Sequence, residues 1–359
     1  MKELSKEELQ DILYGCTVLG TGGGGDLANG LRLVDSALAE GRRFRLAGLD
    51  ELPDDGFIGV PYICGALTKG EKEPALPVLK EPLGVLATKV MERYLGRTFD
   101  GVMSTELGGE NTAQAFYTAA LLDKVIVDAD PAGRSVPELQ HSTFFLKDIP
   151  ITPLAVADAY GNSAVLDRVA SDKRAEDWVR ALAVVSDNSV GVLDHPAPAK
   201  ILRGAVIPGA VSYAGKIGAT LRRARTSGGD PARGIVEAVG GKVVFRGIVK
   251  TAEYESREGF TYGTVILNGR SEYSGHSYKI WYKNENIVSW LDDAVHAMVP
   301  ELICLMDEAG NSQINPRVKE GALLTAFVLP APAEWTTQRG LDCFGPRHFG
   351  FDFDYKPLL

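Results

Sequence analysis

The sequence predicts an α/β protein in which a mainly parallel α/β sheet domain is followed by a helical segment and then by a mainly antiparallel β domain. Up to about residue 168, short apolar runs alternate with segments of helical spacing, a pattern typical of a sheet with helices on its faces. Helix-like segments follow from Ser171, and after Gly240 the runs are rich in Val, Ile, Phe, Tyr and Thr. We therefore divide the chain into residues 1–168 and 169–359, with 171–239 helical and 240–359 β-rich.

The stretch Lys124–Glu138 gives the parallel sheet its clearest strand. Val125, Ile126 and Val127 form a short β-branched apolar run, which is typical of a buried strand in a parallel sheet. The run stops at Asp128, and the proline and glycine that follow within six residues end any regular element.

The other elements are placed by capping signals, periodicity and turn residues. Ser5 and Glu8 match a capping box that starts the first helix. Helices are predicted over 5–14, 27–40, 82–95, 111–122, 173–185, 198–203, 211–225 and 231–239, and a short helix or strand over 139–146. Strands are predicted over 16–19, 43–46, 57–63, 99–104, 125–128, 242–251, 259–267, 276–282, 302–306 and 323–329, with a hairpin over 153–168 and a charged loop over 70–77.

Composition and charge exclude several classes of protein. The 359 residues carry a net charge of −9, and their basic residues are scattered, so nucleic acid is not expected as a partner. The longest apolar runs are too short for a membrane span, and the charged N-terminus shows no signal-peptide core. Four widely spaced cysteines without a C-x-x-C pair favour a reduced, cytoplasmic chain over a disulfide scaffold.

A glycine-rich loop, T-G-G-G-G-D, precedes the second predicted helix. Its backbone N–H groups and the helix N-terminus could bind a carboxylate or phosphate of a substrate. The predicted substrate-binding residues here are Gly22, Gly23, Gly24, Gly25 and Asp26. The loop also matches G-x-G-x-x-G, but the preceding strand is short and no clean acidic residue follows at the required distance, so NAD is not expected. A tight turn without a ligand is the alternative.

Carboxylates stand where two predicted strands end, and ligands bind at the carboxyl ends of strands in open α/β sheets. The predicted catalytic residues are therefore Glu106, Asp128, Asp130 and Glu138, with Asn111 and Arg134 as further substrate-binding residues. Such a site could activate a water molecule by general base catalysis, with or without a metal. The alternative is that the two aspartates cap a turn and Arg134 pairs with one of them.

The five histidines show no metal-binding spacing, and each has a structural role as the alternative to ligation. A zinc site could be assembled from residues distant in sequence, for instance His141 with Asp128, Asp130 or Glu106. No nucleophile elbow or Walker loop is present. The aromatic tail over 345–355 is interpreted as packing, or as a wall or subunit contact formed with Arg347.

Six motifs in a fixed order resemble the DUF917 family, also called the S-methyl thiohydantoin desulfurase family. They are T-G-G-G-G-D (21–26), E-L-G-G-E-N (106–111), D-A-D-P-A-G-R-S-V-P-E-L-Q (128–140), Y-K-N-E-N-I-V (282–288), P-E-L-I-C (300–304) and G-P-R-H-F-G-F-D (345–352). The resemblance covers nearly the whole chain and implies two domains, the first of them α/β. One departure is H-S-T-F-F at 141–145, where the family pattern is nearer M-x-T-F-H, so the histidine is displaced by four positions.

Two functions follow from the resemblance. In the first, the chain is a hydrolase that removes sulfur from a small thiohydantoin-type ring, with water activated by the strand-end carboxylates. In the second, it is a non-catalytic accessory or binding subunit of a hydantoinase/oxoprolinase-type system. The expected partners are accordingly a small-molecule substrate, a hydantoinase-type enzyme and further copies of the chain.

Overall fold

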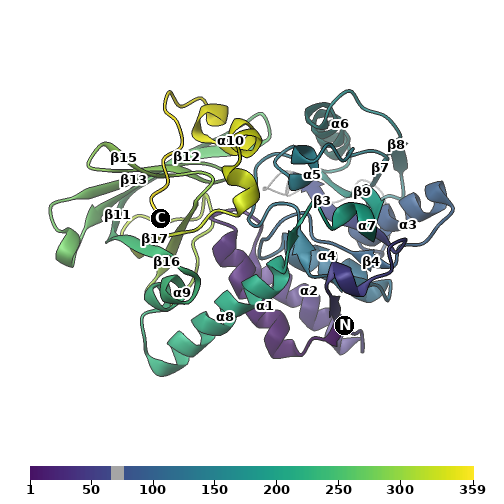
Figure 1. The fold of residues 1–359 in the computed structure, drawn as a ribbon, viewed down its shortest axis with the longest axis horizontal. Coiled ribbons are helices and arrows are strands. Elements are labelled where there is room, and N and C mark those ends of the chain that lie inside the picture. The colour runs from purple at the N-terminus through teal and green to yellow at the C-terminus, as the bar shows by residue number, and fades with distance from the viewer. Residues whose placement is uncertain (66–76) are drawn as a thin grey trace.

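The described chain builds two large sheets joined by a layer of helices (Figure 1), with a small two-stranded sheet besides them. The structure is a computed structural model and describes residues 1–65 and 77–359. The charged loop predicted for 70–77 lies almost wholly outside these residues. In Figure 1 the sheet of the first half lies on the right and the sheet of the second half on the left, with α1 and α8 between them.

The first sheet is mixed. Over the described residues it has eight strands, which in spatial order are β1 (Lys2–Glu3), β2 (Arg45–Ala47), β5 (Val125–Val127), β4 (Gly101–Val102), β3 (Phe57–Gly65), β9 (Ser189–Pro198), β7 (Leu154–Ala157) and β8 (Ser163–Leu166). The four central neighbours β2, β5, β4 and β3 are parallel, and the remaining pairs are antiparallel. The predicted α/β class is thus confirmed, with a parallel centre extended on both sides by antiparallel strands.

The second sheet is antiparallel and curled, as predicted for the C-terminal part. In the described chain its seven strands are, in spatial order, β15 (Ala294–Met298), β14 (Glu285–Leu291), β13 (Ser277–Lys283), β12 (Phe260–Gly269), β11 (Lys242–Arg257), β17 (Leu323–Leu329) and β16 (Leu302–Asp307). A separate antiparallel pair joins β6 (Ala129–Asp130) to β10 (Ile207–Pro208).

Helices cover the sheets and fill the space between them. They are α1 (Lys6–Leu19), α2 (Leu27–Ala39), α3 (Leu83–Leu95), α4 (Asn111–Leu121), α5 (Thr143–Leu146), α6 (Asp172–Val185), α7 (Ala199–Leu202), α8 (Ala210–Ser227), α9 (Pro231–Val239) and α10 (Gln338–Phe344). Short 3-10 turns are η1 (Leu49–Glu51), η2 (Ser271–Tyr273), η3 (Ala333–Thr336) and η4 (Pro346–Phe349).

Most predicted elements are confirmed, but one predicted strand is wrong, and β9, β14, β15 and α10 were not predicted. Val125–Val127 is a parallel strand between two others, as predicted. The predicted strand over 16–19 is wrong, because α1 continues to Leu19 and only Gly20 ends it. Strand β9 was not predicted. It follows α6 in the segment predicted to be helical, and it pairs with β3 in the first sheet.

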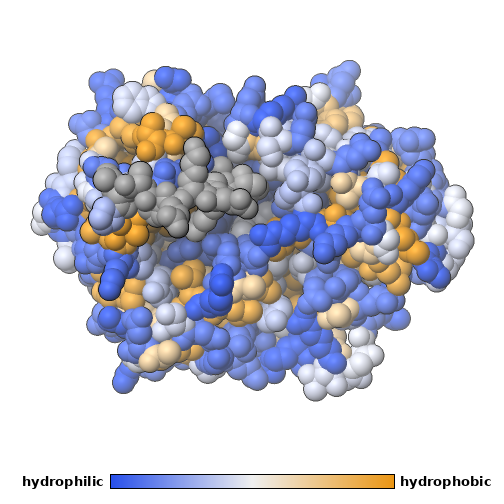
Figure 2. Space-filling view, turned by 180° about the vertical axis from the view of Figure 1, so that it is seen from behind, coloured by the Kyte–Doolittle hydropathy of each residue, from blue (hydrophilic) through white to orange (hydrophobic). Residues whose placement is uncertain are grey.

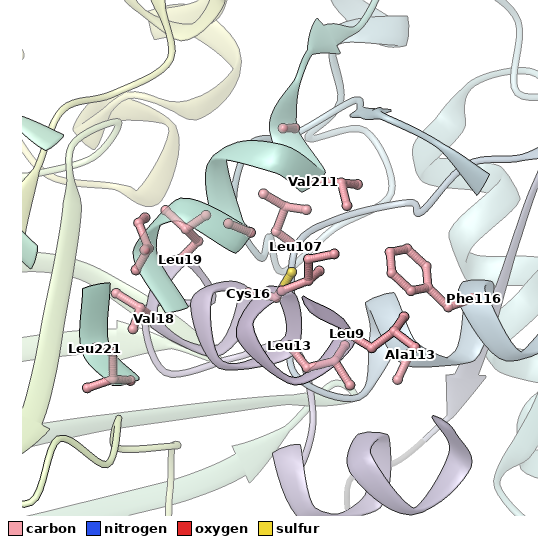
Figure 3. Close-up of a cluster of buried hydrophobic side chains, with 14 of the residues drawn as sticks. Leu9, Leu13, Cys16, Val18, Leu19, Leu107, Ala113, Phe116, Val211 and Leu221 are labelled. Carbon is pink, nitrogen blue, oxygen red and sulfur yellow. The ribbon is translucent and has the colours of Figure 1, made fainter. Parts of the chain in front are cut away.

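One hydrophobic core spans both halves of the chain. Its members on α1, α4 and α8 pack together, with Leu9, Leu13 and Cys16 of α1 close to Phe116 and Val211 (Figure 3). The same cluster continues into the second sheet through residues of β16 and β17, namely Leu302, Cys304, Met306, Phe327 and Leu329. Because burial of apolar surface is the main driving force of folding, this shared core holds the halves together.

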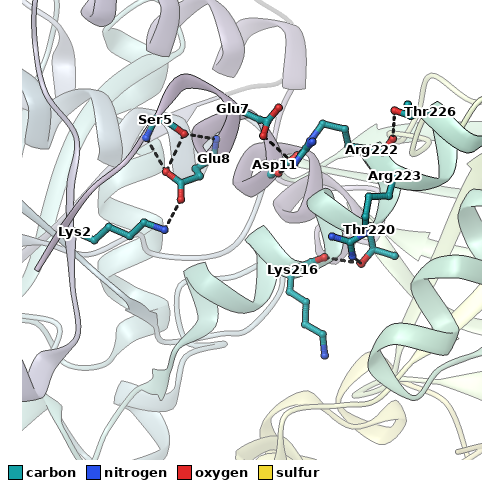
Figure 4. Close-up of polar contacts among 10 residues, drawn as sticks. All are labelled: Lys2, Ser5, Glu7, Glu8, Asp11, Lys216, Thr220, Arg222, Arg223 and Thr226. Atoms are coloured by element: carbon teal, nitrogen blue, oxygen red, sulfur yellow. Dashed lines mark hydrogen bonds and ion pairs between the residues drawn. The ribbon is translucent and has the colours of Figure 1, made fainter.

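Helices α1 and α8 approach each other at glycine positions. A Cβ at Gly15 would lie 1.8 Å from the carbonyl oxygen of Ala214, and one at Gly218 would lie 1.7 Å from that of Asp11. At the edge of this contact, Arg222 donates two hydrogen bonds of 2.8 and 2.9 Å to the Asp11 carboxylate (Figure 4). The two helices therefore depend on glycine for their spacing.

The face of the molecule opposite to the view of Figure 1 is mainly hydrophilic. Figure 2 shows apolar residues in separate patches among polar ones on the back face. Among the described helices, none combines the length and the apolar character needed to cross a membrane. All four cysteines are free thiols and are buried.

The α1–α8 contact gives a stability test. We expect Gly15→Ala to lower the free energy of unfolding by about 1–3 kcal/mol, the usual cost of overpacking, although alanine is intrinsically favoured over glycine in a helix. The matched control is Gly204→Ala, whose added Cβ meets nothing within 4 Å. Urea unfolding of both variants measures the difference, and equal stabilities would show that the two helices have room to move apart.

Candidate functional site

The glycine-rich loop between α1 and α2 lies in the junction between the two halves. The carbonyl of Thr21 accepts a 2.8 Å hydrogen bond from the backbone N–H of Asn286 on β14, in the second half. The carbonyl of Gly24 accepts bonds of 3.0 and 3.1 Å from the N–H groups of Glu110 and Asn111, in the first half. The loop thus forms part of the contact between the halves.

At each of the four loop glycines, an added Cβ would meet a neighbouring residue. A Cβ at Gly23 would lie 1.8 Å from Oε1 of Glu285, and one at Gly24 would lie 2.4 Å from Cα of Gly108. Gly24 also has a φ of +79°, which side chains disfavour. Added Cβ atoms at Gly22 and Gly25 would likewise meet neighbours at 2.4 and 2.5 Å. The protein itself packs against these positions, so substrate binding by this loop remains a prediction.

Asp26 starts α2 at the end of the loop. Its side chain accepts a 2.8 Å hydrogen bond from the N–H of Ala28, which is an N-cap contact, and it pairs with the guanidinium of Arg317. The hydrogen bond from Arg317 is the largest factor that lowers the pKa of Asp26.

Two buried carboxylates from opposite halves, Glu106 and Glu285, lie near this loop and repel each other electrostatically. Glu106 accepts a 2.8 Å bond from the N–H of Val136 and a further bond from the amide of Asn111, which confirms that these two predicted residues are neighbours. Glu285 lies at the start of β14, and its Oε2 has no hydrogen-bond partner among the described residues. Burial raises the pKa of Glu106 to about 7 and, with repulsion from Glu106, that of Glu285 well above its usual range.

Arg134 lies at the centre of the junction and is fully buried. Its five N–H groups all donate hydrogen bonds within the protein. The acceptors are the carbonyls of Ser135 (3.2 Å), Pro300 (3.1 Å), Glu301 (3.2 Å) and Asn286 (3.4 Å) and the hydroxyl of Thr21 (2.9 Å). The predicted contact between Arg134 and a substrate is therefore untested, while its role in joining the halves is visible.

Asp128 and Asp130, predicted as a catalytic pair, bind different groups. Asp128 accepts bonds from the N–H and hydroxyl of Ser212 in the first turn of α8. Asp130 accepts bonds of 2.8 and 2.9 Å from the N–H of Gly133 and so closes the turn after β6. Burial raises the pKa of Asp130 to about 8. Asp130 therefore matches the turn-capping alternative, whereas the pairing of Arg134 with an aspartate in that alternative is wrong, because Arg134 donates to other acceptors. A catalytic role for either aspartate remains a prediction.

Three side chains with ligand atoms converge a short distance from this junction. Glu138, His141 and His348 each offer one such atom, and these atoms lie within 4.8 Å of one another. The Nε2 atoms of the two imidazoles are 2.9 Å apart. Glu138 and His141 come from the loop that leads into α5, and His348 comes from η4 near the C-terminus, so the cluster joins the two halves.

The surroundings of this cluster are largely closed and aromatic. His141 is fully buried and touches the rings of Phe344 and Phe349. Burial lowers the pKa of His141 well below its usual value and also lowers that of His348, so both imidazoles are neutral near pH 7. Neutral imidazole carries a lone pair that can accept a proton or bind a metal ion.

Glu138 has two further partners in the cluster. Its Oε1 forms an ion pair with Lys283 at the end of β13, and its Oε2 accepts a 2.7 Å bond from the amide of Gln140. The ammonium of Lys283 also lies 4.1 Å from the centre of the Phe260 ring. The cluster therefore brings together the carboxylate of Glu138, two neutral imidazoles and the ammonium of Lys283.

A second acid–histidine pair packs close to α5. Asp194 accepts a 2.9 Å bond from the hydroxyl of Tyr62, and its other oxygen lies 2.8 Å from Nδ1 of His195. The ring of His195 stacks on Phe144 at 4.4 Å, and its Nε2 is buried without a partner in the described chain. His195 has a φ of +42°, an unusual conformation for a residue with a side chain.

The sequence located one member of the cluster and missed another. Glu138 was predicted as catalytic, and His141 was considered as a metal ligand. The example set of His141 with Asp128, Asp130 or Glu106 is not what the described residues form, because the side chains that meet His141 are those of Glu138 and His348. His348 lies 207 positions from His141, so no spacing pattern could have paired them; only the motif G-P-R-H-F-G pointed to that part of the tail.

Comparisons with known proteins cover the whole chain. The model of the N-terminal domain described as S-Me-THD-like matches residues 7–168, and that of the C-terminal domain matches residues 170–358. A crystal structure of a protein from Chromobacterium violaceum, solved by a structural genomics consortium, is 22% identical with a TM-score of 0.78, and the alignment covers 100% of both chains. At this identity the likeness shows the fold alone. A search of the curated proteins found no match.

The buried carboxylates give a prediction on stability and pH. The pKa of Glu106 is about 7 in the folded protein and near 4.5 when it is exposed, so its contribution to stability is full below pH 4.5 and is lost as the pH rises through 7. We expect Glu106→Gln, which cannot ionise, to gain stability relative to the wild type between pH 5 and pH 8. Urea unfolding at several pH values measures this, with the exposed Glu237→Gln as control. A constant difference across that range would contradict the raised pKa.

Proposed function

The chain belongs to the S-Me-THD-like family, and on this premise we propose that it is a hydrolase that removes sulfur from a small cyclic amide of the thiohydantoin type. The premise fits the resemblance of its six motifs to the S-methyl thiohydantoin desulfurase family. The choice of substrate rests on the family, and the choice of residues rests on the geometry of the site.

The observation that carries the proposal is the convergence of Glu138, His141 and His348. Hydrolysis at an sp² carbon needs a group that holds a water molecule and takes its proton. Neutral imidazole nitrogens and a carboxylate are the side chains that most often do this near pH 7. Because burial lowers the pKa of both histidines, neither imidazole is positively charged near pH 7. In the structure one Nε2 accepts a hydrogen bond from the other, and a bound water molecule would replace this contact.

The reaction would proceed by addition and elimination at the ring carbon that bears sulfur. The oxygen of the water molecule forms a bond to this carbon, and one proton of the water passes to a basic group of the cluster. The negative charge that develops on the ring can be stabilised by the ammonium of Lys283, which already lies beside Glu138. The carbon–sulfur bond then breaks, the second proton of the water is lost as the carbonyl forms, and the sulfur leaves as sulfide or thiolate and is protonated.

The second candidate is a non-catalytic accessory or binding subunit of a hydantoinase-type system. It is favoured by the contacts of Arg134 and of the glycine-rich loop, since both groups predicted to bind substrate are instead used between the halves of the protein. A subunit of this kind would release no sulfur by itself, so an activity assay on the purified chain separates the two candidates.

We expect Glu138→Gln and His141→Ala to lower turnover about a hundredfold or more, the usual size of the loss when an acid–base group is removed. Release of sulfide or thiol from a panel of thiohydantoins and S-methyl thiohydantoins measures the rate. Asp128→Asn is the matched control, because Asp128 binds the start of α8, and its turnover should stay near that of the wild type. Normal rates in the first two variants, or a large loss in the third alone, would place the chemistry elsewhere.

A further inference from the structure

We propose that Glu138, His141 and His348 together bind one divalent transition-metal ion, with zinc as the best fit. This inference rests on the proposed function for the role of the ion, which would hold and activate the attacking water. The binding itself follows from the three side chains and can be tested without any substrate.

The set of donor atoms is the first reason. Two histidine nitrogens and one glutamate oxygen form a combination that zinc sites use when they keep a fourth position open for water. The ligand atoms lie within 4.8 Å of one another, and two of the three side chains are buried while His348 is partly exposed. His348 is thus the member of the three that solvent reaches.

The two imidazoles are the second reason. Their Nε2 atoms lie 2.9 Å apart and face each other among the aromatic rings of the tail. Two nitrogen lone pairs at this distance repel unless a proton or a cation lies between them. Two nitrogens that each lie about 2.1 Å from a shared ion in tetrahedral geometry are about 3.4 Å apart. The rings would have to separate by only about half an ångström to admit zinc.

The third reason is a ring nitrogen of His141 that is buried without a hydrogen-bond partner in the described chain. The Nδ1 of His141 has no hydrogen-bond partner in the described residues, although the side chain is fully buried. Among the described residues the hydrogen-bond partner of the His141 ring is Nε2 of His348, so one of these two Nε2 atoms carries the proton that is shared between them. The Nε2 lone pair is free to serve as a ligand once the proton lies on Nδ1.

Lys283 is the competitor for the same carboxylate. Its ammonium pairs with Oε1 of Glu138 and lies over the ring of Phe260. A metal ion bound to the Glu138 carboxylate would lie close to this ammonium, and the two positive charges repel each other. Replacement of Lys283 by an uncharged side chain of similar length should therefore strengthen metal binding.

The test is a titration of the full-length protein, stripped of metal, with Zn²⁺ alone in competition with a chromophoric chelator. We expect one ion per chain, at least about a hundredfold weaker binding in His141→Ala and in His348→Ala, and tighter binding in Lys283→Met. His276→Ala is the matched control, because His276 is exposed and pairs with Asp292 outside the cluster, and its affinity should equal that of the wild type. Substitution with Co²⁺ should give a visible spectrum of tetrahedral coordination that the His348→Ala variant lacks.

The outcomes separate the site from the function. Equal zinc affinity in the wild type, His141→Ala and His348→Ala overturns the metal site, even if the enzyme releases sulfur. One zinc ion bound through these histidines, with no release of sulfur from any ring tested, supports the metal site and rejects the proposed function. Melting temperatures show whether His141→Ala still folds. If it does not, the half-buried His348 and the carboxylate variant Glu138→Gln decide the question.

Discussion

The contacts of Arg134 hold the arrangement of the two halves. A buried guanidinium is costly unless all of its N–H groups find acceptors. Here five donors meet acceptors on Thr21 of the glycine-rich loop, on Ser135 beside it, and on Asn286, Pro300 and Glu301 of the second half. The halves cannot separate without exposing these groups, and burial lowers the pKa of Arg134 only to about 10, so it stays charged.

The same residue fixes the loop that carries the proposed chemistry. Glu138 and His141 follow Arg134 by four and seven positions. The N–H of Val136, which lies between Arg134 and Glu138, donates a hydrogen bond to Glu106. On the other side of the junction, Lys283 and Glu285 flank the turn that leads into β14. The cluster around Glu138 is thus positioned by a rigid polar junction, which is what an acid–base or metal site requires. The cost of burying two carboxylates that repel each other, Glu106 and Glu285, is the kind of local conflict that proteins retain at functional sites.

The sequence predicted the fold to the extent that the signals were local. Ser5 and Glu8 form the predicted capping box, and Val125–Val127 is the predicted parallel strand. The run over 16–19 is helical because its apolar side chains pack in one core with those of α8. This helix lies about 200 positions later in the sequence, so no local signal could predict the contact. Strand β9 was missed because its pairing with β3 is likewise formed only in the folded chain. The candidate site shows the same limit, since the loop residue Glu138 was predicted but its distant partner His348 was not.

The most direct test of the account is a double-mutant cycle on the release of sulfur. Glu138 lies in the first half and His348 in the second, and the account holds that they act as one unit. We expect Glu138→Gln, His348→Ala and the double variant to lose similar amounts of kcat/KM, each about a hundredfold, because either change alone disables the unit. A double variant that loses about ten-thousandfold, the product of two independent losses, would contradict a single site shared by the two halves.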